Sequence, residues 1–310
     1  MEISEEKRKE LISQLDRLSK RAFEYLRFLG AGFIKKIMRM ISSPRIFFEN
    51  IFWRLRVKIS GCKSEIPVTF FFGRKILLDI RDRDALDLKL FGLLPADEEC
   101  SLTKYFIMNL KSNDVFYDIG ANWGFYSYLA VIFCNEVHVF EPLPNIAKLL
   151  EKNLSGDAKV TFNNIAISDK KGSSEIYISE SSGRSTINKE SVEMNGGKNM
   201  GKIIIQTTTL DEYVLGKNLP TIIKMDVEGA EYMVIKGGID IFSKHNPIIA
   251  LEVWSSSFGG SISMKAVELL REMGYTSYRI TDKSTLEGIK GDLSLSIGQG
   301  RNCENFIFKK

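Results

Sequence analysis

The sequence predicts an α/β fold built on a mostly parallel β-sheet with helices on both faces. After Asn113, short apolar runs alternate with segments of helical pattern, as expected where each parallel strand is followed by a crossover helix. These runs lie at residues 114–119, 136–140, 158–162, 221–225 and 247–253. The composition, with 44% hydrophobic and 26% charged residues, is that of an ordinary globular protein and excludes disordered, collagenous and disulfide-scaffold classes.

The first 60 residues are predicted to form a basic, amphipathic helical extension. Residues 4–43 contain no proline, and apolar residues recur at alternating spacings of four and three. They are Leu11, Leu15, Leu18, Ala22, Tyr25 and Leu29. Such a stripe predicts a helix with one apolar face. Gly30 and Gly32 interrupt it, and a second basic segment continues to Pro44, so we predict two helices followed by a break.

The positive charge of the chain is concentrated in this extension. Residues 1–60 carry 14 Lys and Arg against 7 Asp and Glu, a surplus of seven, although the whole chain has a net charge of only +4. One interpretation is peripheral contact with an anionic membrane or docking of a partner. The alternative is an extension packed on its own domain or on the second copy of a homodimer. Nucleic acid is not an expected partner, because no dense basic cluster interleaved with aromatic residues lies near the later motifs.

A mixed lead-in at residues 61–96 connects the extension to a main domain at residues 97–310. The runs VTFFF and KILLDI predict a β-hairpin, and an acidic first turn predicts a helix from Asp97 to Leu110. Within the main domain, SEIYIS and KIIIQTT predict two further strands on either side of a polar stretch that we expect to be mobile.

The four cysteines show no paired spacing and the chain has only two histidines, so neither a zinc site nor a disulfide framework is expected. Reduced thiols favour a cytoplasmic location. The sequence also shows no run typical of a secretory signal or a membrane span.

The strongest local motif is VFYDIGANWGFYS at residues 115–127, in which Gly120 and Gly124 flank a turn between a buried strand and a helix. Strand 136–140 ends in Glu141, where nucleotide-binding α/β units place a carboxylate that accepts hydrogen bonds from ribose. Together these features predict a site for an adenosine-like ligand at the carboxyl edge of the sheet. The alternative is a glycine turn and a surface glutamate on an unrelated α/β fold.

The residues of the loop favour one ligand over another. Asp118 precedes the first glycine, and Asn122 stands where a dinucleotide fingerprint has its second glycine. An acid and an amide suit the zwitterionic tail of S-adenosylmethionine better than a pyrophosphate. An NAD-dependent oxidoreductase remains the alternative, although no metal set for hydride chemistry is evident.

A second candidate site lies in IIKMDVEGAE at residues 222–231. Asp226 follows a buried strand and is a candidate general base, with Glu228 orienting the substrate hydroxyl or raising the pKa of that acid. In the alternative interpretation, Asp226 or Glu228 caps the next helix. Glu252 ends the following strand, so Asp226 and Glu252 are also candidate Mg²⁺ ligands, although a metal is not favoured.

Taken together, these motifs resemble the FkbM-type S-adenosylmethionine-dependent methyltransferase family. The resemblance covers roughly residues 97–310 and rests on VFYDIGANWGFYS, VHVFEPLPN, FNNIAISD, TTTLDEY, IIKMDVEGAEYMVIKG and ENFIF. It implies a class I methyltransferase (Rossmann-like) fold, with a seven-stranded, mainly parallel sheet whose last strand, ENFIF, is antiparallel.

The resemblance also implies roles for individual residues. The implied cofactor-binding residues are Asp118, Gly120, Asn122, Gly124, Glu141, Pro142, Asn164 and Ala166. The first three would line the methionine end, Glu141 would hold the ribose hydroxyls, and Asn164 and Ala166 follow the third strand, where the fold places adenine. Trp123, inside the turn, departs from the family pattern.

The expected reaction is O-methylation of a small or glycosidic acceptor, with a saccharide or glycolipid as the leading guess. Oxygen is preferred because the chain lacks the N/D-P-P-Y loop of many amine methyltransferases. Arg184, Ser185 and Thr186 are candidates to close over the acceptor, or else they belong to a surface loop. A non-catalytic protein that binds the cofactor and acts through its helical extension is a further alternative.

Overall fold

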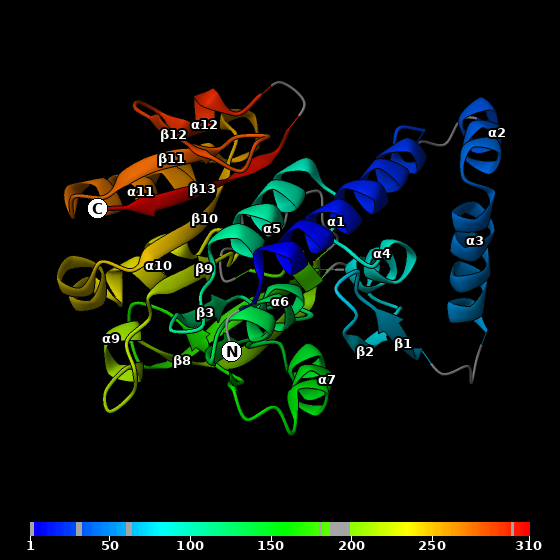
Figure 1. The fold of residues 1–310 in the computed structure, drawn as a ribbon. Coiled ribbons are helices and arrows are strands. Elements are labelled where there is room, and N and C mark those ends of the chain that lie inside the picture. The colour runs from blue at the N-terminus through cyan, green and yellow to red at the C-terminus, as the bar shows by residue number, and fades with distance from the viewer. Residues whose placement is uncertain (1–2, 29–32, 60–63, 180–181, 187–198, 299–300) are drawn as a thin grey trace. The chain divides into compact units, whose positions relative to one another are not determined.

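The computed structural model describes residues 3–28, 33–59, 64–179, 182–186, 199–298 and 301–310. The chain forms two compact units, one within residues 3–100 and the other within residues 101–310 (Figure 1). None of the described helices is both long enough and apolar enough to cross a membrane.

The smaller unit begins with three helices, where the sequence predicted two. They are α1 (Glu5–Leu26), α2 (Phe33–Ser42) and α3 (Pro44–Lys58). The predicted stripe of α1 is largely buried, including Leu11, Leu15 and Ala22. The predicted break is present at Ser43, between α2 and α3, but the third helix, which Pro44 begins, was not predicted. Proline suits the first turn of a helix, where its fixed φ is already helical and its missing N–H has no intrahelical acceptor.

The rest of the smaller unit is the predicted hairpin and a short helix. Strands β1 (Glu65–Thr69) and β2 (Lys75–Asp79) pair antiparallel, with alternate residues buried. Helix α4 (Arg83–Phe91) follows within the region that the sequence left as mixed. The carboxylate of Asp82 caps it by accepting the amides of Asp84 and Ala85 at 2.9 and 3.2 Å.

An eight-stranded sheet forms the centre of the larger unit. Its strands are β3 (Val115–Ile119), β4 (Glu136–Phe140), β5 (Val160–Asn163), β9 (Ile222–Met225), β10 (Ile248–Trp254), β11 (Thr276–Ile280), β12 (Leu286–Ile289) and β13 (Cys303–Lys309). The order is β12-β11-β13-β10-β9-β3-β4-β5. Strands β10, β9, β3, β4 and β5 pair in parallel, whereas β13 is antiparallel to both of its neighbours. The fold is therefore that of a class I methyltransferase, with β12 added at one edge as an eighth strand.

Helices cover both faces of this sheet. They are α5 (Asp97–Asn109), α6 (Phe125–Phe133), α7 (Pro144–Leu154), α9 (Leu210–Tyr213), α10 (Glu231–Lys236), α11 (Gly260–Glu272) and α12 (Leu293–Ser296). Alternate residues of β3 point to opposite layers, as the period of a strand requires. The Phe116 ring packs 5.3 Å from that of Phe106 in α5, and the next residue, Tyr117, joins the main apolar cluster on the other face.

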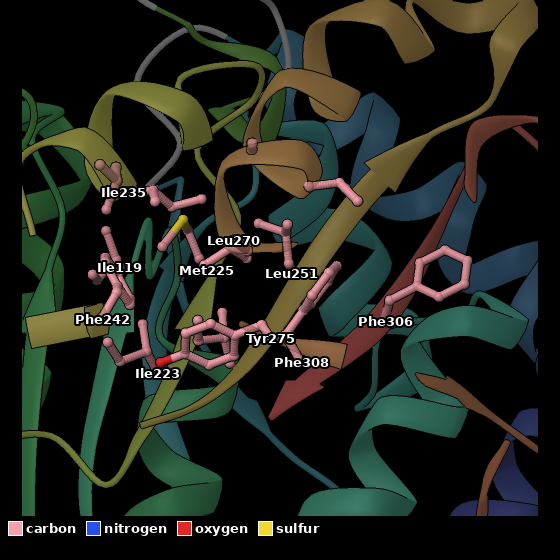
Figure 2. Close-up of a cluster of buried hydrophobic side chains, with 14 of the residues drawn as sticks. Ile119, Ile223, Met225, Ile235, Phe242, Leu251, Leu270, Tyr275, Phe306 and Phe308 are labelled. Carbon is pink, nitrogen blue, oxygen red and sulfur yellow. The ribbon is translucent and has the colours of Figure 1, made fainter. Parts of the chain in front are cut away.

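That apolar cluster joins the parallel strands to the C-terminal half of the chain. Ile223 and Met225 of β9 and Leu251 of β10 lie in it together with Leu270 of α11 and Phe308 of β13 (Figure 2). All five side chains are fully buried. The cluster fixes β9 beside β10, so that the ends of these strands carry their following loops in a defined register.

The predicted insertion forms a separate three-stranded sheet. Its strands are β6 (Ala166–Ile167), β7 (Gly172–Ser179) and β8 (Asn199–Thr208), in the order β6-β8-β7. Within the polar stretch, residues 187–198 lie outside the described residues. Ser185 and Thr186 are buried: Thr186 exchanges two backbone hydrogen bonds with Tyr177, and the Ser185 hydroxyl accepts the amide of Ser179. These hydrogen bonds attach residues 185 and 186 to β7. Arg184 ends a short 3-10 turn, Ser182–Arg184.

Candidate functional site

The structure brings the two predicted motifs together where β4, β3 and β9 end. Because these strands are adjacent and parallel, their carboxyl ends share one edge of the sheet. The amide of Gly120 donates to the carbonyl of Phe140 at 3.1 Å, and the amide of Asp226 donates to the carbonyl of Ile119 at 3.1 Å. Backbone hydrogen bonds therefore hold the glycine loop between the end of β4 and the turn after β9.

Gly120 is required by the close approach of these two loops. Its φ is +81°, and a Cβ at this position would lie 2.0 Å from the carbonyl oxygen of Asp226. Gly124, with φ +78°, is confined less tightly, because a Cβ there would lie 2.6 Å from Cδ1, the movable end of the Leu150 side chain in α7. Asn122 also has a positive φ, +49°, which asparagine tolerates better than most residues. The glycine pattern thus reflects packing within the protein.

Glu141 supports the glycine loop from the end of β4. Its side chain is buried, and its Oε2 and Oε1 accept the amides of Asn122 and Leu143, each at 2.8 Å. Burial raises the pKa of this carboxyl to about 7, and the charge of Asp118 adds to the rise, whereas the two amides oppose it. Each oxygen keeps further acceptor capacity beyond its amide.

Asn164 and Ala166, both expected near the adenine, have different surroundings in the structure. The amide nitrogen of Asn164 donates to the carbonyls of Glu141 and Pro142 at 2.8 and 3.1 Å, so this side chain positions the segment that carries Glu141. Ala166 is buried in β6, where it pairs with Thr207 of the three-stranded sheet.

Asp118 is a buried acid within β3. Its Oδ2 accepts the hydroxyl of Ser127 at 2.5 Å, whereas its Oδ1 has no hydrogen-bond partner among the described residues. The ammonium of Lys224 lies 4.0 Å from that Oδ1. Burial raises the pKa of Asp118, while Lys224 and the hydroxyl of Ser127 lower it.

Lys224 is the residue that the sequence reasoning missed. Only 5% of it is exposed, and its Nζ lies 3.1 Å from Oδ2 of Asp226 and 3.4 Å from the carbonyl of Gly120. It also pairs in register with Asp118 on the neighbouring strand. A signal was present in the sequence: a lysine inside a strand that reads as fully buried is rare unless the charge is paired.

The turn after β9 is held by Glu231. Its buried Oε1 accepts the amides of Val227 and Gly229 at 3.1 and 3.2 Å, and burial raises its pKa to about 7. The capping interpretation had Asp226 or Glu228 accept amides of the helix that follows, whereas these contacts of Glu231 satisfy amides of the turn before that helix. Glu228 has φ +54°, an uncommon conformation for a side chain with a Cβ and one that is found most often at functional sites.

Asp226 is the partly exposed acid of this edge, with 28% of its side chain exposed. Lys224 donates a hydrogen bond to Oδ2 of Asp226, whereas Oδ1 of Asp226 has no hydrogen-bond partner among the described residues. Glu252, the other candidate metal ligand, accepts the indole N–H of Trp254 at 3.0 Å. The described residues contain no cluster of three or more side chains suited to a metal ion.

Comparison with known proteins identifies the domain. A family model described as the Methyltransferase FkbM domain matches residues 118–277, a range that contains Gly120, Glu141 and Asp226. No curated protein sequence matches the chain.

Methyltransferases are among the solved structures with similar chains, at low identity. The methyltransferase FkbM of Methylobacillus flagellatus KT is 13% identical, with 88% of this chain and 59% of that chain covered and a TM-score of 0.41. This chain therefore corresponds to 59% of the length of that protein. TYW2 of M. jannaschii, solved with AdoMet, is 11% identical, with 81% of this chain and 89% of that chain covered and a TM-score of 0.42. Trm5b of Pyrococcus abyssi is 12% identical, with 79% of this chain and 56% of that chain covered and a TM-score of 0.41.

Proposed function

The chain belongs to the FkbM methyltransferase family, and we propose that it transfers the methyl group of S-adenosylmethionine to a hydroxyl oxygen of a small or glycosidic acceptor. The observation that carries this proposal is the joining of the glycine loop, Glu141 and Asp226 at one sheet edge by direct hydrogen bonds. A cofactor held by the first two therefore lies beside the third.

The donor and acceptor chemistry of the edge supports S-adenosylmethionine as the cofactor. The ligand offers an ammonium, a sulfonium and two ribose hydroxyls, all of which are attracted to carboxylates. Asp118 has a buried oxygen without a hydrogen-bond donor, and Glu141 keeps acceptor capacity on both oxygens. A pyrophosphate would instead meet three acids, Asp118, Glu141 and Asp226. This contrast disfavours a dinucleotide and hence the oxidoreductase alternative.

Within this proposal the bound cofactor supplies an electrophilic methyl group, and the protein aligns the acceptor and manages one proton. Oδ1 of Asp226 is available to take the proton of the acceptor hydroxyl as its oxygen attacks. Lys224, bonded to Oδ2, fixes the orientation of the carboxylate. Much of the rate enhancement then comes from holding the two reactants in line.

Methyl-labelled S-adenosylmethionine tests the proposal directly. The intact chain is incubated with the labelled cofactor and with cell extract or a panel of glycans and glycolipids, and the products are analysed by mass spectrometry. We expect the label as a methyl ether on a hydroxyl. Label recovered on an amine nitrogen or on nucleic acid would overturn the assignment of the acceptor. Addition of EDTA should leave turnover unchanged, because the proposal requires no Mg²⁺.

A further inference from the structure

Helices α2 and α3 carry apolar side chains on the faces that they turn to solvent. We call these residues the exposed stripe. They are Ile34, Met38 and Ile41 on α2, and Phe48, Ile51, Phe52, Leu55 and Ile59 on and directly after α3. Their exposed fractions run from 39% to 75%. The spacings of three and four residues place each group on one helical face.

The opposite faces of the same helices attach them to the smaller unit. The guanidinium of Arg39 in α2 lies 5.8 Å above the ring of Tyr25 in α1. In α3, the amide of Asn50 donates to the hydroxyl of Tyr25 at 3.1 Å, and the ammonium of Lys89 lies 5.2 Å above the ring of Trp53. Polar and cationic contacts thus face inward, and the orientation that they fix leaves the stripe uncovered.

This arrangement is the reverse of that in α1. The apolar stripe of α1 is buried at Leu11, Leu15 and Ala22, as expected for a helix that covers a core. Exposed apolar side chains gathered on one helical face often mark an interaction site.

The positive charge of the extension is concentrated in the same two helices. Residues 33–58 contain seven Lys and Arg and a single acid, Glu49. In contrast, α1 (Glu5–Leu26) contains six Lys and Arg against five acids. Lys35 and Lys36 are exposed beside the stripe of α2. A second copy that paired through the same stripe would bring a like charge to it, whereas an anionic lipid surface offers the complementary charge together with an apolar interior.

We propose that α2 and α3 form an interfacial membrane anchor that lies in the plane of an anionic lipid surface. The exposed stripe enters the boundary between headgroups and acyl chains, and the flanking lysines and arginines pair with lipid phosphates. The proposal assigns the contact to residues 33–59 and excludes α1. It is independent of the acceptor and cofactor of the methyltransferase.

Sedimentation of the intact chain with lipid vesicles tests the anchor. The vesicles contain phosphatidylcholine alone or phosphatidylcholine mixed with phosphatidylglycerol. We expect binding to the mixed vesicles that weakens with added salt. The variant Ile41→Ser with Leu55→Ser should bind at least about tenfold more weakly, because both side chains leave the lipid. The matched control, Leu215→Ser with Leu295→Ser, alters two residues that are 72% and 69% exposed in the larger unit and should bind like the wild type.

Charge and oligomeric state complete the test. Lys35→Glu with Lys36→Glu should remove the preference for phosphatidylglycerol. Unchanged circular dichroism and an unchanged thermal unfolding curve would show that each variant is folded. Equal binding by the wild type and by Ile41→Ser with Leu55→Ser would overturn the proposal. The proposal would also be overturned if the wild type formed a dimer without lipid and this variant were a monomer, because the stripe would then be the interface between two copies of the chain.

Discussion

Replacement of Lys224 by methionine tests how the charges of the sheet edge are balanced. Methionine keeps much of the length of the side chain and removes the ammonium. Asp118 then loses the cation 4.0 Å from its Oδ1, and Asp226 loses its partner at 3.1 Å. Because Lys224 lowers the pKa of Asp118, the variant raises that pKa further above its ordinary value.

The expected loss of stability follows from the geometry. Two unit charges 4 Å apart interact by about 4 kcal/mol at an effective dielectric constant of about 20. Removing one partner of a buried pair typically costs about 3–5 kcal/mol. We therefore expect the free energy of unfolding to fall by about 3–4 kcal/mol at about pH 8. Asp226 adds little, because it is partly exposed and water screens its charge.

The loss should shrink as the pH falls. A carboxyl whose folded pKa lies above its unfolded value binds more protons in the folded state, so stability decreases as the pH rises between the two values. Lowering the pH to about 5 favours protonation of Asp118, whose pKa is raised, and this reduces the uncompensated charge and the loss. Adding Asp118→Asn to Lys224→Met should likewise recover stability at the higher pH.

Urea unfolding of the variants at both pH values measures this. Lys236→Met is the matched control, because Lys236 forms an ion pair with Asp169 at 3.2 Å but is 52% exposed. It should cost less than about 1 kcal/mol. If Lys224→Met costs no more than this control at either pH, the account of a buried, compensated charge is refuted.

Three further predictions concern the glycine loop, the general base and the ribose-binding acid. Gly120→Ala should lower the free energy of unfolding by more than about 3 kcal/mol in thermal unfolding, because its Cβ meets the backbone of Asp226 at 2.0 Å. The control Gly216→Ala, at φ +73° with open space around it, should cost about 1 kcal/mol. Equal losses in the two variants would contradict the packing argument. Asp226→Asn should leave S-adenosylmethionine affinity unchanged in calorimetry and lower turnover at least about 100-fold, whereas unchanged turnover would exclude Asp226 as the base. The pKa of Glu141 is about 7, and ribose hydroxyls favour its ionised form. Cofactor affinity should therefore increase as the pH rises through about 7, and binding should release a proton from Glu141. A cofactor affinity that does not change with pH would contradict this.

The strands and the glycine loop were predictable from the sequence because they depend on local patterns. Apolar runs predicted β3, β4, β5, β9 and β10, and the family resemblance predicted the antiparallel last strand. Strand β12 was not predicted, since its residues are half-buried or exposed and carry no apolar alternation. Helix α3 was missed because Pro44 was taken as a terminator.

The partners of the site residues were not predictable, because they depend on register between strands. The pairing of Asp118 with Lys224 follows from the alignment of β3 with β9, which no local pattern reveals. The role of Glu231 as acceptor for the turn also required the structure, since Asp226 and Glu228 are closer to those amides in sequence. The order of motifs identified the edge of the sheet, and the structure supplied the contacts.

Calorimetric titration of the intact chain with S-adenosylmethionine tests the central claim most directly. We expect S-adenosylmethionine and S-adenosylhomocysteine to bind and NAD not to bind. Glu141→Ala should weaken cofactor binding by about 1–3 kcal/mol through the loss of charge-assisted hydrogen bonds. Glu231→Ala removes an equally buried carboxyl that also accepts two loop amides, and it should affect binding much less. Binding of NAD in place of S-adenosylmethionine, or equal cofactor affinity in the wild type and Glu141→Ala, would contradict the account.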